Sequence, residues 1–174
     1  MTALTTERHP VALLVESLVA ALLDDAAPTK ALCGQRVYVL ADDAVLPEEA
    51  AAPFYGIVLR DGRVTQESAD DQEWLWPIEI GAYQVLEAPT LGAKVTGLPP
   101  FAPGARAGLP DLVWAVVRTI RGRGLGKKWG RFRTVGETAT TVLVPAEEAK
   151  SASALVRRAV KFEFEVGVSF TPIT

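Results

Sequence analysis

Two stretches of the chain repeat apolar residues at the spacing of a helix. The first extends from about Pro10 to Asp24, where eleven of the thirteen residues from Val11 to Leu23 are apolar. Because these residues cover most of the cylinder, we expect this helix to be buried on most sides, either in its own core or partly against a neighbouring subunit. The second helix is predicted from Pro110 to about Ile120, since proline suits a first turn and Gly122 follows as a terminator.

Other stretches alternate apolar and polar residues, as strands do. The clearest is Val156–Phe170, where the even positions from Val160 to Phe170 are apolar and the odd positions between them are mostly charged or polar. Trp74–Leu86 alternates in the same way, although Pro77 indicates an edge position or a bulge. The dipeptide Asp61-Gly62 is typical of a two-residue hairpin turn. Shorter strands are expected at Arg36–Leu40, Phe54–Arg60, Arg63–Glu67 and Thr134–Val144.

These elements predict the α+β class, with a small, mostly antiparallel sheet packed by an N-terminal helix and one middle helix. A length of 174 residues fits a single domain over 1–174. Residues 89–110 form a long loop with five prolines and four glycines, and 121–133 form a basic, Gly-rich loop. Long irregular segments in a compact domain are usually functional, so we expect 89–110 to contact a partner.

Composition adds a reason to expect assembly. Apolar residues make up 49% of the chain, and the mean hydropathy is +0.19, which is high for a small soluble monomer. Residues 1–87 carry a net charge of −10 and residues 88–174 carry +7. Halves of opposite charge can meet within one fold or across a subunit boundary. The apolar excess separately predicts that some surface is buried against another molecule.

The inventory of catalytic groups is small. His9 is the only histidine and Cys33 the only cysteine, so neither a zinc site of ordinary spacing nor an intramolecular disulfide can form, and a reducing compartment is expected. His9 stands beside Pro10, where we expect it to start a helix and not to act as a base. The acidic pairs Asp42-Asp43 and Asp70-Asp71 lack the spacing of a calcium loop. We therefore predict no enzyme, no metal and no cofactor, with catalysis by carboxylates alone left open.

No stretch reaches the roughly 18 consecutive apolar residues that a membrane-spanning helix needs. Glu7 and Glu16 also interrupt the basic flank and apolar region of a signal peptide. We expect neither a membrane partner nor export.

Arg118–Arg133 is the segment richest in candidate chemistry, with seven basic residues and no acid. Gly126-Lys127 superficially suggests a phosphate loop, but Arg121 occupies the position of the first glycine and Lys128 that of the serine or threonine. The candidate partner-binding residues are Arg118, Arg121, Arg123, Lys127, Lys128, Trp129, Arg131 and Arg133.

Three roles for this segment stay open. It can dock on an acidic patch of another subunit, such as 42–49 or 67–73. It can bind a nucleic-acid backbone, with Trp129 and Phe132 available for stacking. It can also be a solvated loop. The isoelectric point of about 5.3 weighs against a nucleic-acid-binding module, so the first role is favoured and the second is the main alternative.

The order of these elements resembles that of a known group of proteins. An apolar helix and a strand precede the segment Pro53–Val58 (PFYGIV), a Trp-containing strand, a second helix, and closing strands that include Arg157–Phe164 (RRAVKFEF). This order is similar to that of the tail terminator and related tail-completion or minor tail proteins of long-tailed bacteriophages and phage-like particles. The 89–110 stretch and the basic loop depart from that pattern.

The resemblance implies a structural protein of the virion. Such a protein forms a ring, typically of six copies, at the head-proximal end of the tail, after assembly in the host cytoplasm. Its partners would be its own copies, the tail tube protein and the head–tail connector proteins, and DNA would pass through the lumen. The resemblance supplies no catalytic residues, and another head–tail connector subunit is an alternative within the same class.

Overall fold

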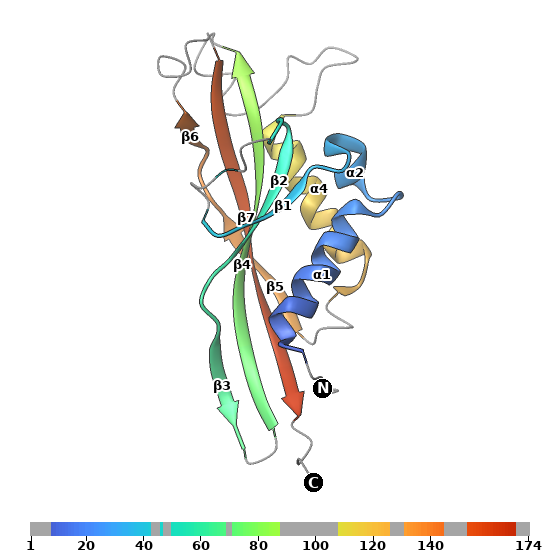
Figure 1. The fold of residues 1–174 in the computed structure, drawn as a ribbon, viewed down its shortest axis with the longest axis vertical. Coiled ribbons are helices and arrows are strands. Elements are labelled where there is room, and N and C mark those ends of the chain that lie inside the picture. The colour runs from blue at the N-terminus through green and yellow to red at the C-terminus, as the bar shows by residue number, and fades with distance from the viewer. Residues whose placement is uncertain are drawn as a thin grey trace.

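The computed structural model describes residues 8–42, 46, 50–68, 71–87, 108–125, 131–144 and 153–169. Within these ranges the helices and strands follow one another as shown in Figure 1. They are α1 (Pro10–Leu23), α2 (Pro28–Cys33), β1 (Val37–Leu40), β2 (Phe54–Leu59), β3 (Arg63–Glu67), β4 (Asp71–Glu87), α4 (Leu109–Gly122), β5 (Arg131–Glu137), β6 (Thr141–Val144) and β7 (Ser153–Ser169).

Two strands of 17 residues, β4 and β7, form the centre of a seven-stranded sheet. They pair antiparallel from Asp71↔Ser169 to Glu87↔Ser153. At about 3.3 Å per residue this ribbon is roughly 55 Å long. The strand order is β1-β2-β4-β7-β5, with β3 also on β4 and β6 also on β7. Only β1 and β2 pair parallel, so the predicted α+β class with a mostly antiparallel sheet is confirmed.

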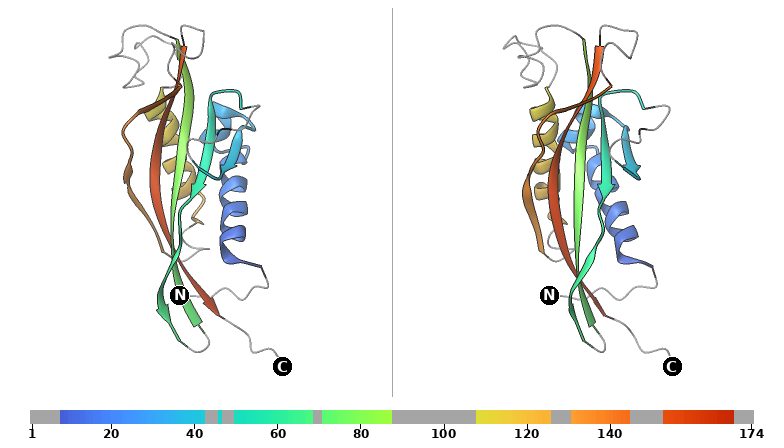
Figure 2. Two further views of the ribbon diagram at one scale, coloured as in Figure 1. Left: turned by 60° about the vertical axis from the view of Figure 1, so that its left-hand side comes forward. Right: turned by 90° about the vertical axis from the view of Figure 1, so that its left-hand side faces the viewer.

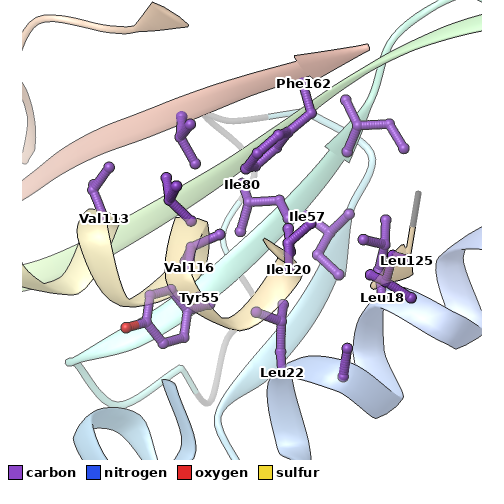
Figure 3. Close-up of a cluster of buried hydrophobic side chains, with 14 of the residues drawn as sticks. Leu18, Leu22, Tyr55, Ile57, Ile80, Val113, Val116, Ile120, Leu125 and Phe162 are labelled. Carbon is purple, nitrogen blue, oxygen red and sulfur yellow. The ribbon is translucent and has the colours of Figure 1, made fainter. Parts of the chain in front are cut away.

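The three helices of the described ranges cover one face of the sheet (Figure 2). Leu14, Leu18 and Leu22 are fully buried at successive turns of α1, as the apolar pattern requires. They belong to the main core together with one side of α4 and the even-numbered side chains of β4 and β7. Figure 3 shows Leu18 and Leu22 near Ile57 and Ile120 in this core. No helix in the described ranges is long and apolar enough to cross a membrane.

A smaller core lies on the opposite, helix-free face. It contains Leu40, Phe54, Val58 and Tyr83, and the rings of Phe54 and Tyr83 stack with their centroids 4.4 Å apart. Because residues of a strand alternate between faces, Phe54 and Val58 point away from the helices that cover Tyr55. This face therefore has a small apolar cluster of its own around β1 and β2.

The predicted hairpin at Asp61-Gly62 is wrong. β2 and β3 do not pair with each other but follow one another along the same edge of β4, with Leu59 opposite Ile78 and Arg63 opposite Leu75. A Cβ on Gly62 would lie 2.0 Å from Nε1 of Trp76. The glycine is therefore needed for close packing against this indole, and not for a tight turn.

Pro77 does not mark an edge or a bulge in the pairing of β4 with β7. It lies in the central strand β4, opposite Glu163 of β7. On the other side of β4 it faces the break between β2 and β3, where its carbonyl accepts a hydrogen bond from the Arg60 N–H. A residue without an N–H is tolerated there, since neither strand needs that donor.

Several other elements also differ from the expectation. The stretch Thr134–Val144 forms two strands, β5 and β6, which both pair with β7. β5 begins at Arg131 and α4 extends to Gly122, so the segment between them is shorter than the predicted loop 121–133. The six-residue helix α2 was not predicted. Residues 88–107 and 126–130, and so most of the Pro/Gly loop and the centre of the basic loop, lie outside the described residues.

Candidate functional site

The predicted basic residues lie on two different faces of the molecule. Arg118 and Arg121 are exposed on α4, and Arg123 follows the end of that helix. Arg131 and Arg133 are exposed on β5. Because Phe132 packs against the main core, its two neighbours point to the helix-free face. The other candidates, Lys127, Lys128 and Trp129, lie outside the described residues. The structure therefore does not bring the five described arginines into one patch.

The outer face of α4 combines a large aromatic side chain with two arginines. Trp114 is 58% exposed and lies one turn from Arg118 and two turns from Arg121. The guanidinium carbon of Arg121 is 5.9 Å from the centroid of the Phe132 ring, and its Nη2 is 3.4 Å from Oγ1 of Thr134. Arg121 is thus held against β5, whereas Trp114 projects into solvent.

Two of the basic residues have acidic partners in the same chain. Arg123 forms an ion pair with Asp24, which joins the ends of α4 and α1. Nη2 of Arg133 lies 2.5 Å from Oε2 of Glu163 on the neighbouring strand β7. These contacts hold elements of the fold together, so Arg123 and Arg133 do not depend on a partner for charge compensation.

A groove of about 630 Å³ crosses the lower part of the helix-free face. Arg131 and Arg133 alternate along it with Glu163 and Glu165, because Arg131 pairs in register with Glu165 and Arg133 with Glu163. The remaining lining residues are Thr65, Leu75 and Phe132. The two arginines and the two glutamates of the groove balance each other in charge, so the groove does not favour a strongly anionic ligand.

The predicted acidic patches are placed only in part. Most of 42–49 lies outside the described residues. The second patch is at the lower end of the sheet, where β3 and β4 meet (Figure 1). Glu67 and Asp71 are exposed there, and Oε1 of Glu67 accepts a hydrogen bond of 2.6 Å from Gln72. This end of the sheet is acidic, as predicted.

Sequence analysis missed a cluster of charges on the helix-free face. Glu79 and Arg157 are 8% and 4% exposed, and Nη2 of Arg157 lies 2.8 Å from Oε2 of Glu79. Nε of Arg157 also donates to the hydroxyl of the buried Tyr83, over 3.1 Å. Arg60 and Lys161 approach the same carboxylate from its two sides, at 3.5 Å each. Apart from Arg60, which follows β2, these groups occupy odd positions of the two long strands, and the register of β4 against β7 brings them together.

This environment shifts the pKa of Glu79. Burial by itself raises the pKa of a carboxyl group, because it disfavours the charged form. The hydrogen bond from Arg157 and the charges of Arg60, Arg157 and Lys161 act in the opposite direction and outweigh it, so the pKa of Glu79 is lowered. Glu79 is therefore ionised at neutral pH and holds three cations on one side of the sheet.

The borders of the sheet are the second feature that sequence analysis missed. Among the described strands, β1 and β3 form one border, and β5 and β6 form the other. Each of the four edge strands carries an exposed valine: Val39 is 51% exposed, Val64 39%, Val135 54% and Val142 49%. Only Val85 and Trp114 complete the set of large exposed apolar side chains in the described ranges. A run of charge-free residues, VYVL in β1 or TVLV in β6, was the signal available in the sequence.

The single histidine and the single cysteine of the chain both lie in the described ranges. Nδ1 of His9 accepts a hydrogen bond of 3.3 Å from the Val11 N–H, and its ring meets Trp76 edge-on, so it begins helix α1 as expected. Cys33 is buried, and burial raises the pKa of its thiol to about 11. No group of three or more His, Cys, Asp or Glu side chains suitable for a metal ion occurs among the described residues.

No protein-family model matches the chain, and no curated protein matches it. The functional proposal below is therefore based on the surfaces of this molecule and on the order of its elements.

Proposed function

We propose that this chain is a structural subunit that assembles with its own copies into a closed ring, as a phage tail terminator does. The observation that carries the proposal is the exposed valine on every edge strand of both borders. An edge strand offers unpaired N–H and C=O groups, and monomeric proteins protect such edges with charge or cover. Here β1 and β6 contain no charged residue.

The two borders differ from each other, which favours a ring. A contact between two copies of one border would produce a twofold dimer, whereas a contact between different borders passes from each copy to the next. Such a heterologous contact ends in a ring if the rotation closes, and in a filament otherwise. Six copies are expected from the resemblance to tail terminators.

In this proposal the ring caps the tail tube and joins it to the head. Its other partners are then the tube protein and the head–tail connector proteins, with DNA passing through the lumen. The protein would be assembled in the host cytoplasm and become part of the virion. The function would be geometric and not catalytic, since the buried charges near Glu79 contact one another.

The first experiment is the native mass of the purified protein over a range of concentrations, at low and at high salt. A closed oligomer, above all a hexamer, is the expected result, with rings visible by electron microscopy. A single monomer mass at every concentration would contradict self-assembly.

A second candidate function is nucleic-acid binding by the outer face of α4. The observation in its favour is Trp114, 58% exposed beside Arg118, because a free indole can stack on a base while an arginine contacts phosphate. If this is correct, Trp114→Ala and Arg118→Ala each weaken the binding of labelled single-stranded DNA. Arg133→Ala is the control, since Arg133 is paired with Glu163 on the other face. Absence of binding at low salt would end this alternative.

A further inference from the structure

We propose that the two borders of the sheet recognise each other in one defined arrangement. β6 of one copy lies beside β1 of the next, and β5 lies beside β3, so that the sheet continues across the subunit boundary. This inference rests on the proposed self-assembly and adds which strands meet, in which direction and at which level.

The strand directions are the first argument. β3 is antiparallel to β4, and β1 is parallel to β2, which is itself antiparallel to β4. Both strands of this border therefore run opposite to β4. On the other border, β5 and β6 are antiparallel to β7 and so run in the same direction as β4.

A rotation axis that runs roughly along the strands preserves these directions from one copy to the next. β6 then meets β1 in the antiparallel sense, and β5 meets β3 in the same sense. Because β1 lies one strand further out than β3, both antiparallel ladders form at once in a ring that is wider at the level of β1 than at the level of β3. If a border paired with the same border of a second copy around a twofold axis, the other border of each subunit would stay unpaired.

The levels of the strands are the second argument. The pairing partners give the height of each edge strand along β4. On one border, β1 lies at the height of Glu79–Ala82, through β2, and β3 lies at the height of Gln72–Leu75. On the opposite border, β6 is level with Tyr83–Val85 and β5 with Leu75–Ile80. Each border thus has an upper and a lower strand. A single shift of about three to four residues brings both pairs level at the same time, which is about 10–13 Å at the rise of a strand.

This shift is compatible with a closed ring. Four to five strands per copy, spaced about 4.8 Å apart, make each subunit roughly 20–24 Å wide along the sheet. A shift of about 10–13 Å over that width corresponds to strands tilted by roughly 25–30° from the ring axis. Closed barrels tilt their strands for the same reason, typically by about 35–45°, so a shift between neighbours is compatible with closure without a helical rise.

The chemistry of the strands is the third argument. At the upper level two charge-free strands meet, and the shift brings Val39 of β1 beside Val142 of β6. At the lower level the same shift brings Val64 of β3 beside Thr134 of β5. The apolar edge strand β1 is thus matched with the apolar edge strand β6.

The test uses three valine variants that are matched for exposure. Val39→Lys and Val142→Lys each place a charge on one border. Val85→Lys is the control, because Val85 is 49% exposed but lies on β4 beyond the strands that would meet. All three sites are exposed in the subunit, so thermal unfolding at low concentration should match the parent chain. Native mass is then measured at concentrations where the parent chain is assembled.

The expected result is that Val39→Lys and Val142→Lys each remove every species larger than the monomer, whereas Val85→Lys assembles like the parent chain. A mixture of the two border variants should give a 1:1 dimer and nothing larger, because each copy keeps one intact border. Combining Val39→Lys with Val142→Glu in one chain should restore the ring, since every contact then pairs a lysine with a glutamate.

Three results would contradict this inference, and each has a different meaning for the proposed self-assembly. If the parent chain assembles and both border variants assemble as well as Val85→Lys does, the border contact is wrong while self-assembly stands. If mixing the two border variants restores large species, the contact is not heterologous and the inference is overturned. If the parent chain itself stays monomeric at every concentration, the proposed function fails together with this inference.

Discussion

Glu79 is the residue that organises the charges of the helix-free face. Its carboxylate contacts Arg157, Arg60 and Lys161, of which Arg157 is nearly inaccessible to water. A buried ion pair adds little net stability compared with an apolar pair, but removing one partner leaves an uncompensated buried charge. Glu79 is therefore expected to matter more for stability than any exposed ion pair of the chain.

We predict that Glu79→Gln lowers the free energy of unfolding at pH 7 by about 3 kcal/mol. The pKa of Glu79 is lowered in the folded protein from its ordinary value of 4.5, so the ionised group stabilises the fold above that pH. The stabilisation is lost as the pH falls through the folded-state pKa. Urea unfolding between pH 7 and pH 3 should show this loss in the parent chain and a flatter profile in Glu79→Gln.

Glu137→Gln is the control for this experiment. Glu137 also pairs with an arginine, Arg158, but their side chains are 39% and 29% exposed, respectively. Partly exposed pairs are screened by water, so a change below about 1 kcal/mol is expected. Equal effects of the two variants would show that the cluster at Glu79 behaves as an ordinary surface pair.

Gly62 is predicted to be required for packing. In Gly62→Ala the new Cβ would lie 2.0 Å from Nε1 of Trp76, a buried ring that is also stacked on Trp74. Because the indole has little room to move, overpacking should cost about 1–3 kcal/mol of stability and alter the tryptophan fluorescence. Gly122→Ala is the control, since nothing lies within 4 Å of a Cβ there. A neutral Gly62→Ala variant would contradict the packing role.

At the scale of elements, the long strands and helices could be predicted because their patterns extend over many residues. The alternation in β4 and β7 and the apolar face of α4 are each repeated several times, so a single irregular residue does not hide them. The six-residue helix α2 contains too few turns to show a period. Asp61-Gly62 has the composition of a hairpin turn, but its conformation is decided by the distant Trp76.

The candidate sites were harder to predict than the elements. The basic residues were identified as individual charges, but α4 carries some of them on the helical side of the molecule, whereas the alternation of β5 directs Arg131 and Arg133 to the helix-free face. The cluster at Glu79 and the two borders depend on which strands pair and in which register. Pairing partners far apart in the chain leave no local pattern, so a single sequence could not reveal them.

The helix α2 has a structural role that can be tested. Oγ1 of Thr29 donates to the carbonyl of Leu22 over 2.7 Å, which satisfies one of the free carbonyls at the end of α1. Thr29→Val should leave this buried carbonyl without its donor and destabilise the fold by about 1–3 kcal/mol. Thr119→Val, which loses only the 3.3 Å contact with Thr29, is expected to cost less. The reverse order in chemical denaturation would contradict this role of α2.

At the scale of the whole molecule, the sheet is longer than the helical layer that covers it. β3 and the lower ends of β4 and β7 extend beyond α1 (Figure 1), and all five side chains of β3 are exposed. Local stability follows buried contacts, so the centre of the sheet near Ile80 and Phe162 should open least often. The isolated subunit is expected to exchange the amide hydrogens of its edge strands far faster than those of its centre.

Assembly through the borders should change this pattern in a specific way. If the edge strands become inner strands of a continuous sheet, their outward N–H groups gain acceptors and exchange more slowly. We predict that raising the protein concentration protects β1, β3, β5 and β6 and leaves the centres of β4 and β7 unchanged, since these are already paired on both sides. Hydrogen–deuterium exchange resolved by peptide measures this directly, with the Val39→Lys chain as the reference that stays monomeric. Protection confined to α4, around Trp114, would instead locate the contact on the helical face, because a helix surface can be covered without any new strand pairing.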